Sequence, residues 1–125
     1  FSKVLIAIRP GRRNKRFIDV ADKICRHFGA SLTLLNIVSE SDSNQKIKRT
    51  EKSSSELISE TKSKSVVKII KSNNPVEAIS EESASYDLLI LGTPEKDNWI
   101  SVLFGVGEDR FVKKAACSVL RLTIK

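Results

Sequence analysis

Short apolar runs, separated by stretches of helical length, are the feature that most constrains the fold of this chain. The first run, Lys3 to Ile8, is continuous, rich in branched residues and closed by Pro10-Gly11. A run of this kind is typical of a strand buried on both faces, and therefore of a central parallel strand. By the same reasoning, further strands are predicted over residues 31–38, 65–71, 87–91 and 118–124.

Two of the intervening segments have clear helical features. Between Lys15 and Phe28 apolar residues recur at helical spacing, and Gly29 stands where a left-handed C-terminal cap belongs. Asn74 and Pro75 predict an N-cap followed by proline at the first helical position. The side chains expected to face inward from this helix are Val76 and Ile79.

The segment from Ser39 to Glu56 is polar, serine-rich and of mixed charge. We expect a mobile loop over about 39–56 that runs into a helix of about three turns ending near Lys64. That helix is weakly amphipathic, because its apolar content hardly extends beyond Ile47, Leu57 and Ile58.

Strands that alternate with helices predict right-handed crossovers. The expected fold class is therefore α/β, an open five-stranded parallel sheet with helices on both faces. The 125 residues are enough for one ordinary domain, and neither a repeat nor a second domain is visible, so residues 1–125 are predicted to form a single domain.

The composition limits the chemistry that the chain can perform. Cys25 and Cys117 match no metal-ligand spacing and are read as small buried apolar residues, so no metal site is predicted. His27 has no serine or cysteine with an acid around it, and is expected to be a partly exposed helix residue. No catalytic residue is predicted.

The charge and composition of the chain bear on its partners and its location in the cell. The formal net charge is +7, which favours an anionic partner without identifying it. No apolar run approaches the roughly 20 residues that span a bilayer, so a cytoplasmic location is expected. The chain contains no methionine, so it is expected to be a cut from a longer protein or a trimmed piece.

In open parallel sheets, ligands bind beyond the carboxyl ends of the strands, near the point where the strand order reverses. Two segments leave such ends here, Arg9 to Lys15 and residues 92–109. The cationic cluster in the first segment is either a solvated face or an anion site for a nucleotide in an altered pose, lipid phosphates or an acidic partner. Nucleic acid is disfavoured, since no aromatic residue lies between Arg9 and Arg16.

The last 50 residues of the chain most strongly resemble the universal stress protein family. "NPVEAISEESASYDLLILGT" is similar to the family's third helix and fourth strand, and "FGVGEDRFVKKAACSVLRL" to its last helix and strand. The resemblance extends over nearly the whole chain and implies the family's adenine nucleotide alpha hydrolase-like fold. It also implies a site in which backbone N–H groups surround phosphates at a helix start.

The resemblance is incomplete at that site. Nucleotide-binding members carry glycine, two residues, glycine, nine residues, glycine and then serine or threonine. Gly92 and Gly105 match the outer glycines, but Glu95 and Val106 replace the second glycine and the hydroxyl residue. Where those members place an aspartate after the first strand, this chain has Arg9, which cannot accept a hydrogen bond from adenine.

We therefore expect a non-catalytic universal stress protein-like domain with a degenerate nucleotide motif, serving as a regulatory or assembly module. The alternatives are a stand-alone ATP- or AMP-binding protein and, third, a slow nucleotide hydrolase. No cofactor is expected under the first reading, whereas ATP or AMP is expected under the second. The candidate nucleotide- or anion-binding residues are Arg9, Arg12, Arg13, Val38, Gly92, Gly105, Val106 and Gly107.

Partners follow from the same resemblance. Members of the family commonly dimerise through the last strand, which implies a homodimer formed through residues 118–124. Related domains also occur as cytosolic tails of membrane transporters, which implies contact with a membrane domain of the same polypeptide on its cytosolic face. Trp99 is expected to pack the loop onto the body or onto another subunit rather than to stack on adenine.

Overall fold

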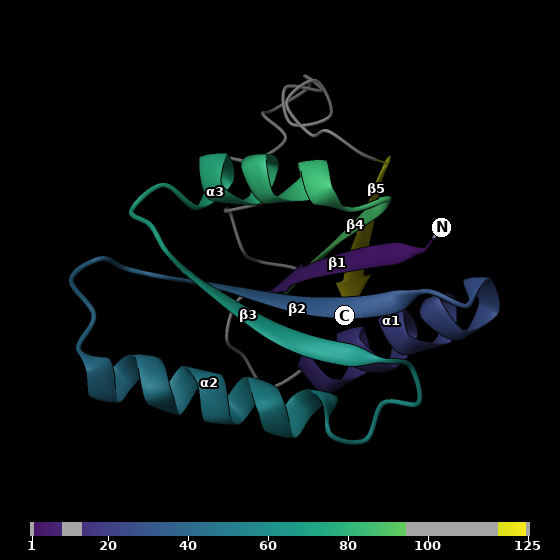
Figure 1. Ribbon diagram of the computed structural model, residues 1–125, viewed down its shortest axis with the longest axis horizontal. Helices are drawn as coiled ribbons and strands as arrows, with labels where there is room; N and C mark the ends of the chain where they lie inside the picture. The colour runs from purple at the N-terminus through teal and green to yellow at the C-terminus, as the bar shows by residue number, and fades with distance from the viewer. Residues whose placement is uncertain (1, 9–13, 95–117, 125) are drawn as a thin grey trace.

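The computed structural model describes residues 2–8, 14–94 and 118–124 (Figure 1). Its strands form one sheet in the order β3-β2-β1-β4-β5, and each neighbouring pair is parallel. The predicted open five-stranded parallel sheet is therefore confirmed. The strands are β1 (Lys3–Ile8), β2 (Ser31–Val38), β3 (Ser65–Lys71), β4 (Leu88–Pro94) and β5 (Ser118–Ile124).

Helices cover both faces of this sheet. The described helices are α1 (Asn14–Phe28), α2 (Asn44–Ile58), α3 (Pro75–Glu82) and the short 3-10 helix η1 (Ser83–Ser85). Figure 1 shows α1 and α2 on one side of the strands and α3 on the other. This arrangement follows from the strand order, because the chain moves one way from β1 to β3 and then crosses back to β4.

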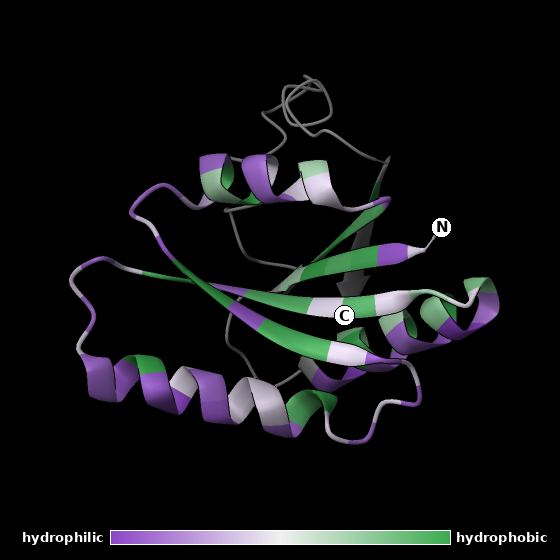
Figure 2. Cartoon of the chain, in the orientation of Figure 1, coloured by the Kyte–Doolittle hydropathy of each residue, from purple (hydrophilic) through white to green (hydrophobic). Residues whose placement is uncertain are grey.

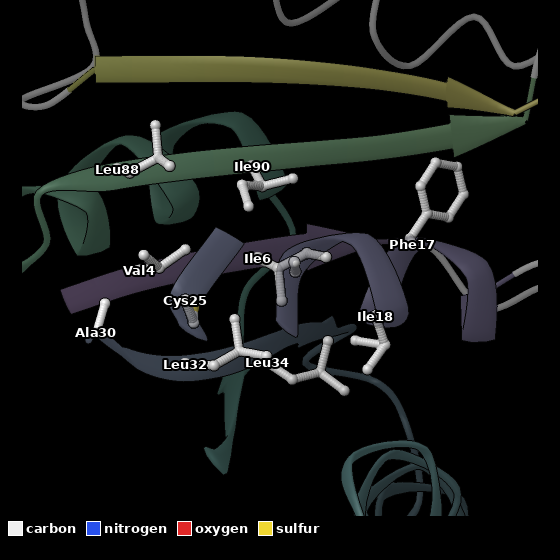
Figure 3. Close-up of a cluster of buried hydrophobic side chains, with 11 residues drawn as sticks. Val4, Ile6, Phe17, Ile18, Cys25, Ala30, Leu32, Leu34, Leu88 and Ile90 are labelled. Atoms are coloured by element: carbon white, nitrogen blue, oxygen red, sulfur yellow. The ribbon is translucent and has the colours of Figure 1, made fainter. Parts of the chain in front are cut away.

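The core consists of two apolar layers, one on each face of the sheet. The α1–α2 side holds Val4, Ile6 and Leu34 together with Phe17 of α1, all of them at most 1% exposed (Figure 3). The α3 side holds a smaller cluster that includes Leu5, Ala7, Leu35, Ile79 and Leu89. Burying one such large aliphatic or aromatic side chain stabilises the fold by about 1.5–3 kcal/mol, so the two layers account for most of the driving force.

Helix α1 follows its predicted pattern closely. It ends at Phe28, and Gly29 has a φ of 65°, the left-handed conformation expected of the cap. Cys25 is fully buried, as predicted. Val20 and Phe28 are 37% and 47% exposed, so these two lie at the margin of the apolar stripe rather than within it.

The prediction for residues 39–56 was wrong over most of its length. Helix α2 begins at Asn44, where the Ser43 side chain accepts a hydrogen bond from the Lys46 N–H at 3.2 Å, and ends at Ile58 rather than near Lys64. Its inward face contains Ser54, 3% exposed, whose hydroxyl accepts a 2.6 Å hydrogen bond from the Asn36 amide of β2. Because Ser54 is polar, the spacing of apolar residues does not reveal the inward face of α2 in the sequence. The hydrogen-bond partner that allows Ser54 to be buried is on another element, strand β2.

Helix α3 and strand β4 agree with expectation apart from a boundary. The Asn74 side chain accepts from the Glu77 N–H at 3.3 Å, Pro75 is the first residue of the helix, and Ile79 is 1% exposed. Val76 packs against the same core layer. Strand β4 ends three residues later than predicted, at Pro94, and begins at Leu88. Asp87 precedes it, and its side chain accepts hydrogen bonds from Ser2 and Lys3.

Hydropathy follows these layers. In Figure 2 the hydrophobic colour concentrates on the central strands, whereas α2 carries much hydrophilic colour. Among the described residues, no helix combines the length and the apolar character that crossing a membrane requires.

Candidate functional site

The strand order places a topological switch point at β1. The chain leaves β1 through α1 toward β2, whereas it arrives at β4, the other neighbour of β1, through α3. The parallel register sets Ile8 of β1 beside Gly92 of β4. Arg9 directly follows Ile8, and Glu95 directly follows Pro94, so the two loop segments that the sequence analysis selected leave from adjacent strands. This is the position at which ligands bind in open α/β sheets.

Val38 occupies the carboxyl end of β2, on the other side of β1. Its side chain is 6% exposed, and its carbonyl accepts a 2.9 Å hydrogen bond from the Ser72 N–H. Val38 and Gly92 are therefore separated by strand β1, at the same edge of the sheet. The side chain of Val38 is therefore buried in the core at this edge.

The remaining candidate residues lie outside the described part of the chain. They are Arg9, Arg12, Arg13, Gly105, Val106 and Gly107, and the same holds for Glu95, Trp99 and Cys117. The structure thus places the strand ends from which both candidate loops leave.

A polar network joins the ends of β2 and β3 at this edge, and the sequence analysis did not identify it. The Asn73 side-chain oxygen accepts from the Ser39 hydroxyl at 3.0 Å and from the Glu40 N–H at 3.2 Å. Its amide nitrogen donates to the Glu40 carboxylate at 3.1 Å. These hydrogen bonds hold the loop after β2 against the loop after β3. The pairing could not be predicted from the sequence, because the two loops are more than thirty residues apart.

The opposite, amino edge of the sheet is held by two aspartates. Asp87 accepts hydrogen bonds from the Ser2 N–H, the Ser2 hydroxyl and the Lys3 N–H at 2.8–2.9 Å. Backbone hydrogen bonds from Ser2 and Lys3, followed by the Ser2 hydroxyl, lower the pKa of Asp87 to about 2. The carboxylate therefore joins the first strand to the fourth at their amino ends.

Asp22 of α1 plays the equivalent part for the loop before β3. It is 7% exposed and accepts from the Ser63 hydroxyl at 2.6 Å, the Ser63 N–H at 2.9 Å and the Lys62 N–H at 3.2 Å. Burial alone would raise the pKa of Asp22, but these donors and the nearby charge of Arg26, 3.5 Å away, outweigh it and hold the pKa below its usual value.

The cysteine and the histidine of α1, Cys25 and His27, do not form a catalytic pair. Burial, followed by the charge of Asp22, raises the pKa of the Cys25 thiol to about 11, so the thiol is protonated at neutral pH. His27 is exposed, and its ring contacts Phe28 edge-on at 4.8 Å between centroids. In the described segments, no group of three or more His, Cys, Asp or Glu side chains is placed to hold a metal ion.

Known structures share this architecture. A universal stress protein in complex with cAMP superposes with a TM-score of 0.73 at 17% identity, covering 98% of this chain and 97% of that one. A universal stress protein from Archaeoglobus fulgidus has a TM-score of 0.70 at 14% identity, covering 97% and 93% of the two chains. The A. fulgidus protein in complex with dAMP has a TM-score of 0.72 at 12% identity, covering 97% of each chain.

Identities this low show the fold alone, and no curated protein sequence is significantly similar to the chain. Family membership comes instead from the sequence profile of the universal stress protein family, which matches residues 1–122 of the 125. The match spans the five strands of the sheet almost entirely. This chain belongs to the universal stress protein family.

Proposed function

We propose that the chain is a non-catalytic regulatory or assembly domain whose strand-end site has lost the contacts required for ordinary nucleotide binding. One observation carries the proposal: Ile8 and Gly92 lie side by side at the switch point. The positions where this family's nucleotide contacts are expected are therefore next to two departures in the sequence, Arg9 and Glu95.

Each departure opposes binding of a nucleotide for a separate physical reason. Glu95 brings a negative charge and a side chain to a position where backbone would approach a phosphate, and Val106 supplies no hydroxyl donor. Arg9 has no acceptor to offer an adenine amino group. Each missing charge-assisted contact weakens binding by roughly 1–3 kcal/mol, so three together are enough to abolish it at cellular nucleotide concentrations.

Restoring the contacts provides the test. Isothermal titration of the purified chain with magnesium ATP, AMP and cAMP should give no saturable heat up to about 1 mM, which is the weak end of specific affinities. The triple variant Arg9→Asp, Glu95→Gly, Val106→Ser should bind nucleotide with a dissociation constant at least about tenfold below this concentration. Micromolar binding by the unchanged chain would overturn the proposal.

The second candidate function is that of a stand-alone nucleotide-binding protein. It is favoured by the two structural neighbours solved in complex with cAMP and dAMP. In this case the arginine loop, Arg9, Arg12 and Arg13, would meet the phosphates in an altered pose. The same titration separates the two functions, since Arg12→Gln with Arg13→Gln should then weaken binding by roughly tenfold or more.

We also propose that the domain works inside a larger polypeptide, as the cytosolic part of a membrane transporter. The formal charge of +7 supports this, since an anionic inner leaflet attracts basic domains. Antibodies raised against α2 should detect a band well above 13.9 kDa in the membrane fraction of source cells. A band near that mass in the soluble fraction would exclude it.

Self-association is the remaining part of the proposal. Among the described strands, β5 is at one edge of the sheet, and none of them pairs with its outer backbone groups. An edge strand of this kind can pair with a second copy. We expect a homodimer through residues 118–124. Light scattering after gel filtration should give twice the 13.9 kDa of the chain, whereas a single-chain mass at high concentration would contradict it.

A further inference from the structure

A basic hollow lies at the amino edge of the sheet, opposite to the switch point. It has a volume of about 430 Å³ and forms where the end of α1, the start of β2 and the loop before β3 meet. Arg26, Lys62 and Lys64 contribute its charged side chains. The Ser2 and Ser31 hydroxyls also line it, and they donate to the Asp87 carboxylate at 2.9 Å and to the Ser2 carbonyl at 3.4 Å. No carboxylate belongs to the described residues that line it.

The positive charge of this hollow is only partly compensated. Two carboxylates contact residues of the lining. Asp22 has an ion pair with Arg26 at 3.5 Å and accepts hydrogen bonds from the Lys62 and Ser63 backbone, and Asp87 accepts from Ser2. In the portion of the chain that the structure describes, no ion pair joins Lys62 or Lys64 to a carboxylate. Lys62 and Lys64 therefore bring two positive charges to one lining, and an anion bound there would be attracted by both.

Helix α1 does not account for this charge. A cation in the last turn of a helix is stabilised by the helix dipole, which explains Arg26. Lys62 and Lys64 belong to the loop between α2 and β3, so the dipole of α1 gives no reason for their presence. Binding of an anion in the hollow would explain why these two cations lie there.

The loop that carries both lysines is held in place before any ligand arrives. Asp22 accepts from the Lys62 and Ser63 N–H groups, and the Lys64 carbonyl accepts a 2.8 Å hydrogen bond from the Leu32 N–H of β2. A rigid loop loses little conformational entropy when it binds, so its charges act on a ligand with little cost. Cys25 and Ala30 add apolar surface to the lining.

We propose that this hollow is a second anion site, which binds a small phosphate-bearing ligand through Lys62 and Lys64 together with Arg26. Its volume falls within the range of small-molecule sites. The shared chemistry is a phosphate dianion, carried either by inorganic pyrophosphate or by a phosphorylated sugar. The site is independent of the strand ends at Ile8 and Gly92.

The experiment is a titration of the ¹⁵N-labelled chain with pyrophosphate and, in parallel, with glucose 6-phosphate, followed by amide chemical shifts. Shifts should concentrate at Ser31, Ser63 and Lys64, with a dissociation constant below about 1 mM at low salt that weakens as salt is added. Tighter binding of the sugar phosphate would identify an organic ligand, whereas tighter binding of pyrophosphate would identify an inorganic one. Either result supports the site.

A charge-matched control makes the test specific. Lys62→Gln with Lys64→Gln should weaken binding at least about tenfold, while Lys48→Gln with Lys52→Gln, the same charge change on exposed positions of α2, should leave it within about twofold. The dispersion of the amide spectrum verifies that each variant is folded.

Three results would overturn the proposal. These are equal losses in the two double variants, no shift with either probe up to about 10 mM, and shifts confined to Ile8 and Gly92. The last would place the anion at the opposite edge and would bear on the nucleotide site instead, so the two proposals fail in different ways.

Discussion

The two edges of the sheet are built by different means. At the amino edge, ionised carboxylates reach across the chain: Asp22 binds the loop before β3, and Asp87 binds the start of β1. At the carboxyl edge, two asparagine side chains make the central contacts: Asn73 accepts from Ser39 and donates to the Glu40 carboxylate, and Asn74 accepts from the Glu77 N–H. In these contacts the acceptor is a carboxylate at the amino edge and chiefly a side-chain amide at the carboxyl edge.

The difference bears on how strongly each edge is held. A carboxylate that accepts several backbone hydrogen bonds is a strong and specific tie, which suits an edge whose loops stay in one arrangement. A neutral cap such as that of Asn74 stabilises a helix start by a smaller amount. Substitutions on either edge can sharpen or break this contrast.

The largest effect is expected at Asp22. Asp22→Ala removes the acceptor for three donors and the partner of Arg26, so the free energy of unfolding should fall by about 2–3 kcal/mol in urea denaturation. Asp19→Ala, on an exposed position of the same helix, should change it by less than about 0.5 kcal/mol. Equal losses would remove the special role of the amino edge.

A smaller loss is expected on the carboxyl edge. Asn74→Ala deletes the N-cap of α3 and should lower the free energy of unfolding by about 1 kcal/mol, because one helix-terminal N–H loses its acceptor. Asn74→Ser keeps a capping oxygen and should recover most of this loss. A loss from Asn74→Ala as large as that from Asp22→Ala would contradict the contrast between the edges.

The hydrogen bonds that the Asp87 carboxylate accepts from Ser2 and Lys3 should make the stability of the fold depend on pH in the acid range. Its folded pKa, about 2, lies below the unfolded value of about 3.9, so its contribution is present above the unfolded pKa and is lost as pH falls through the folded pKa. The unfolding midpoints of the wild type and Asp87→Asn should differ near neutrality and converge between about pH 4 and about pH 2. A difference that stays constant over this range would rule out the carboxylate as its source.

The smallest effect is expected for the ion pair between Lys15 of α1 and Glu60, the residue two positions past the end of α2. The two side chains are 61% and 76% exposed, so water and salt screen the attraction. Glu60→Gln should shift the thermal midpoint by no more than the error of the measurement. A clear shift that disappears in high salt would show that surface charge also holds the helices together.

The sequence predicted the regular elements well where one physical signal dominates. Strands β1, β2, β3 and β5 have the predicted bounds, because fully buried strands need continuous apolar runs. Helix α2 was missed over most of its length, since its inward face uses Ser54 and its polar serines resemble a loop. Of the candidate site, the positions of Ile8 and Gly92 at one edge could be anticipated from the alternation of strands and helices.

The class of fold, the family and the departures at Arg9, Glu95 and Val106 can be read from the sequence alone, since they depend on local patterns and on residue identity. Which distant groups meet is seen only in the folded chain. The ties made by Asp22 and Asp87 join segments more than forty and more than eighty residues apart in the chain. Arg26 lines the same hollow as Lys62 and Lys64, which are more than thirty residues away in the sequence. Such contacts arise when buried apolar faces bring strands into register, and no local propensity encodes them.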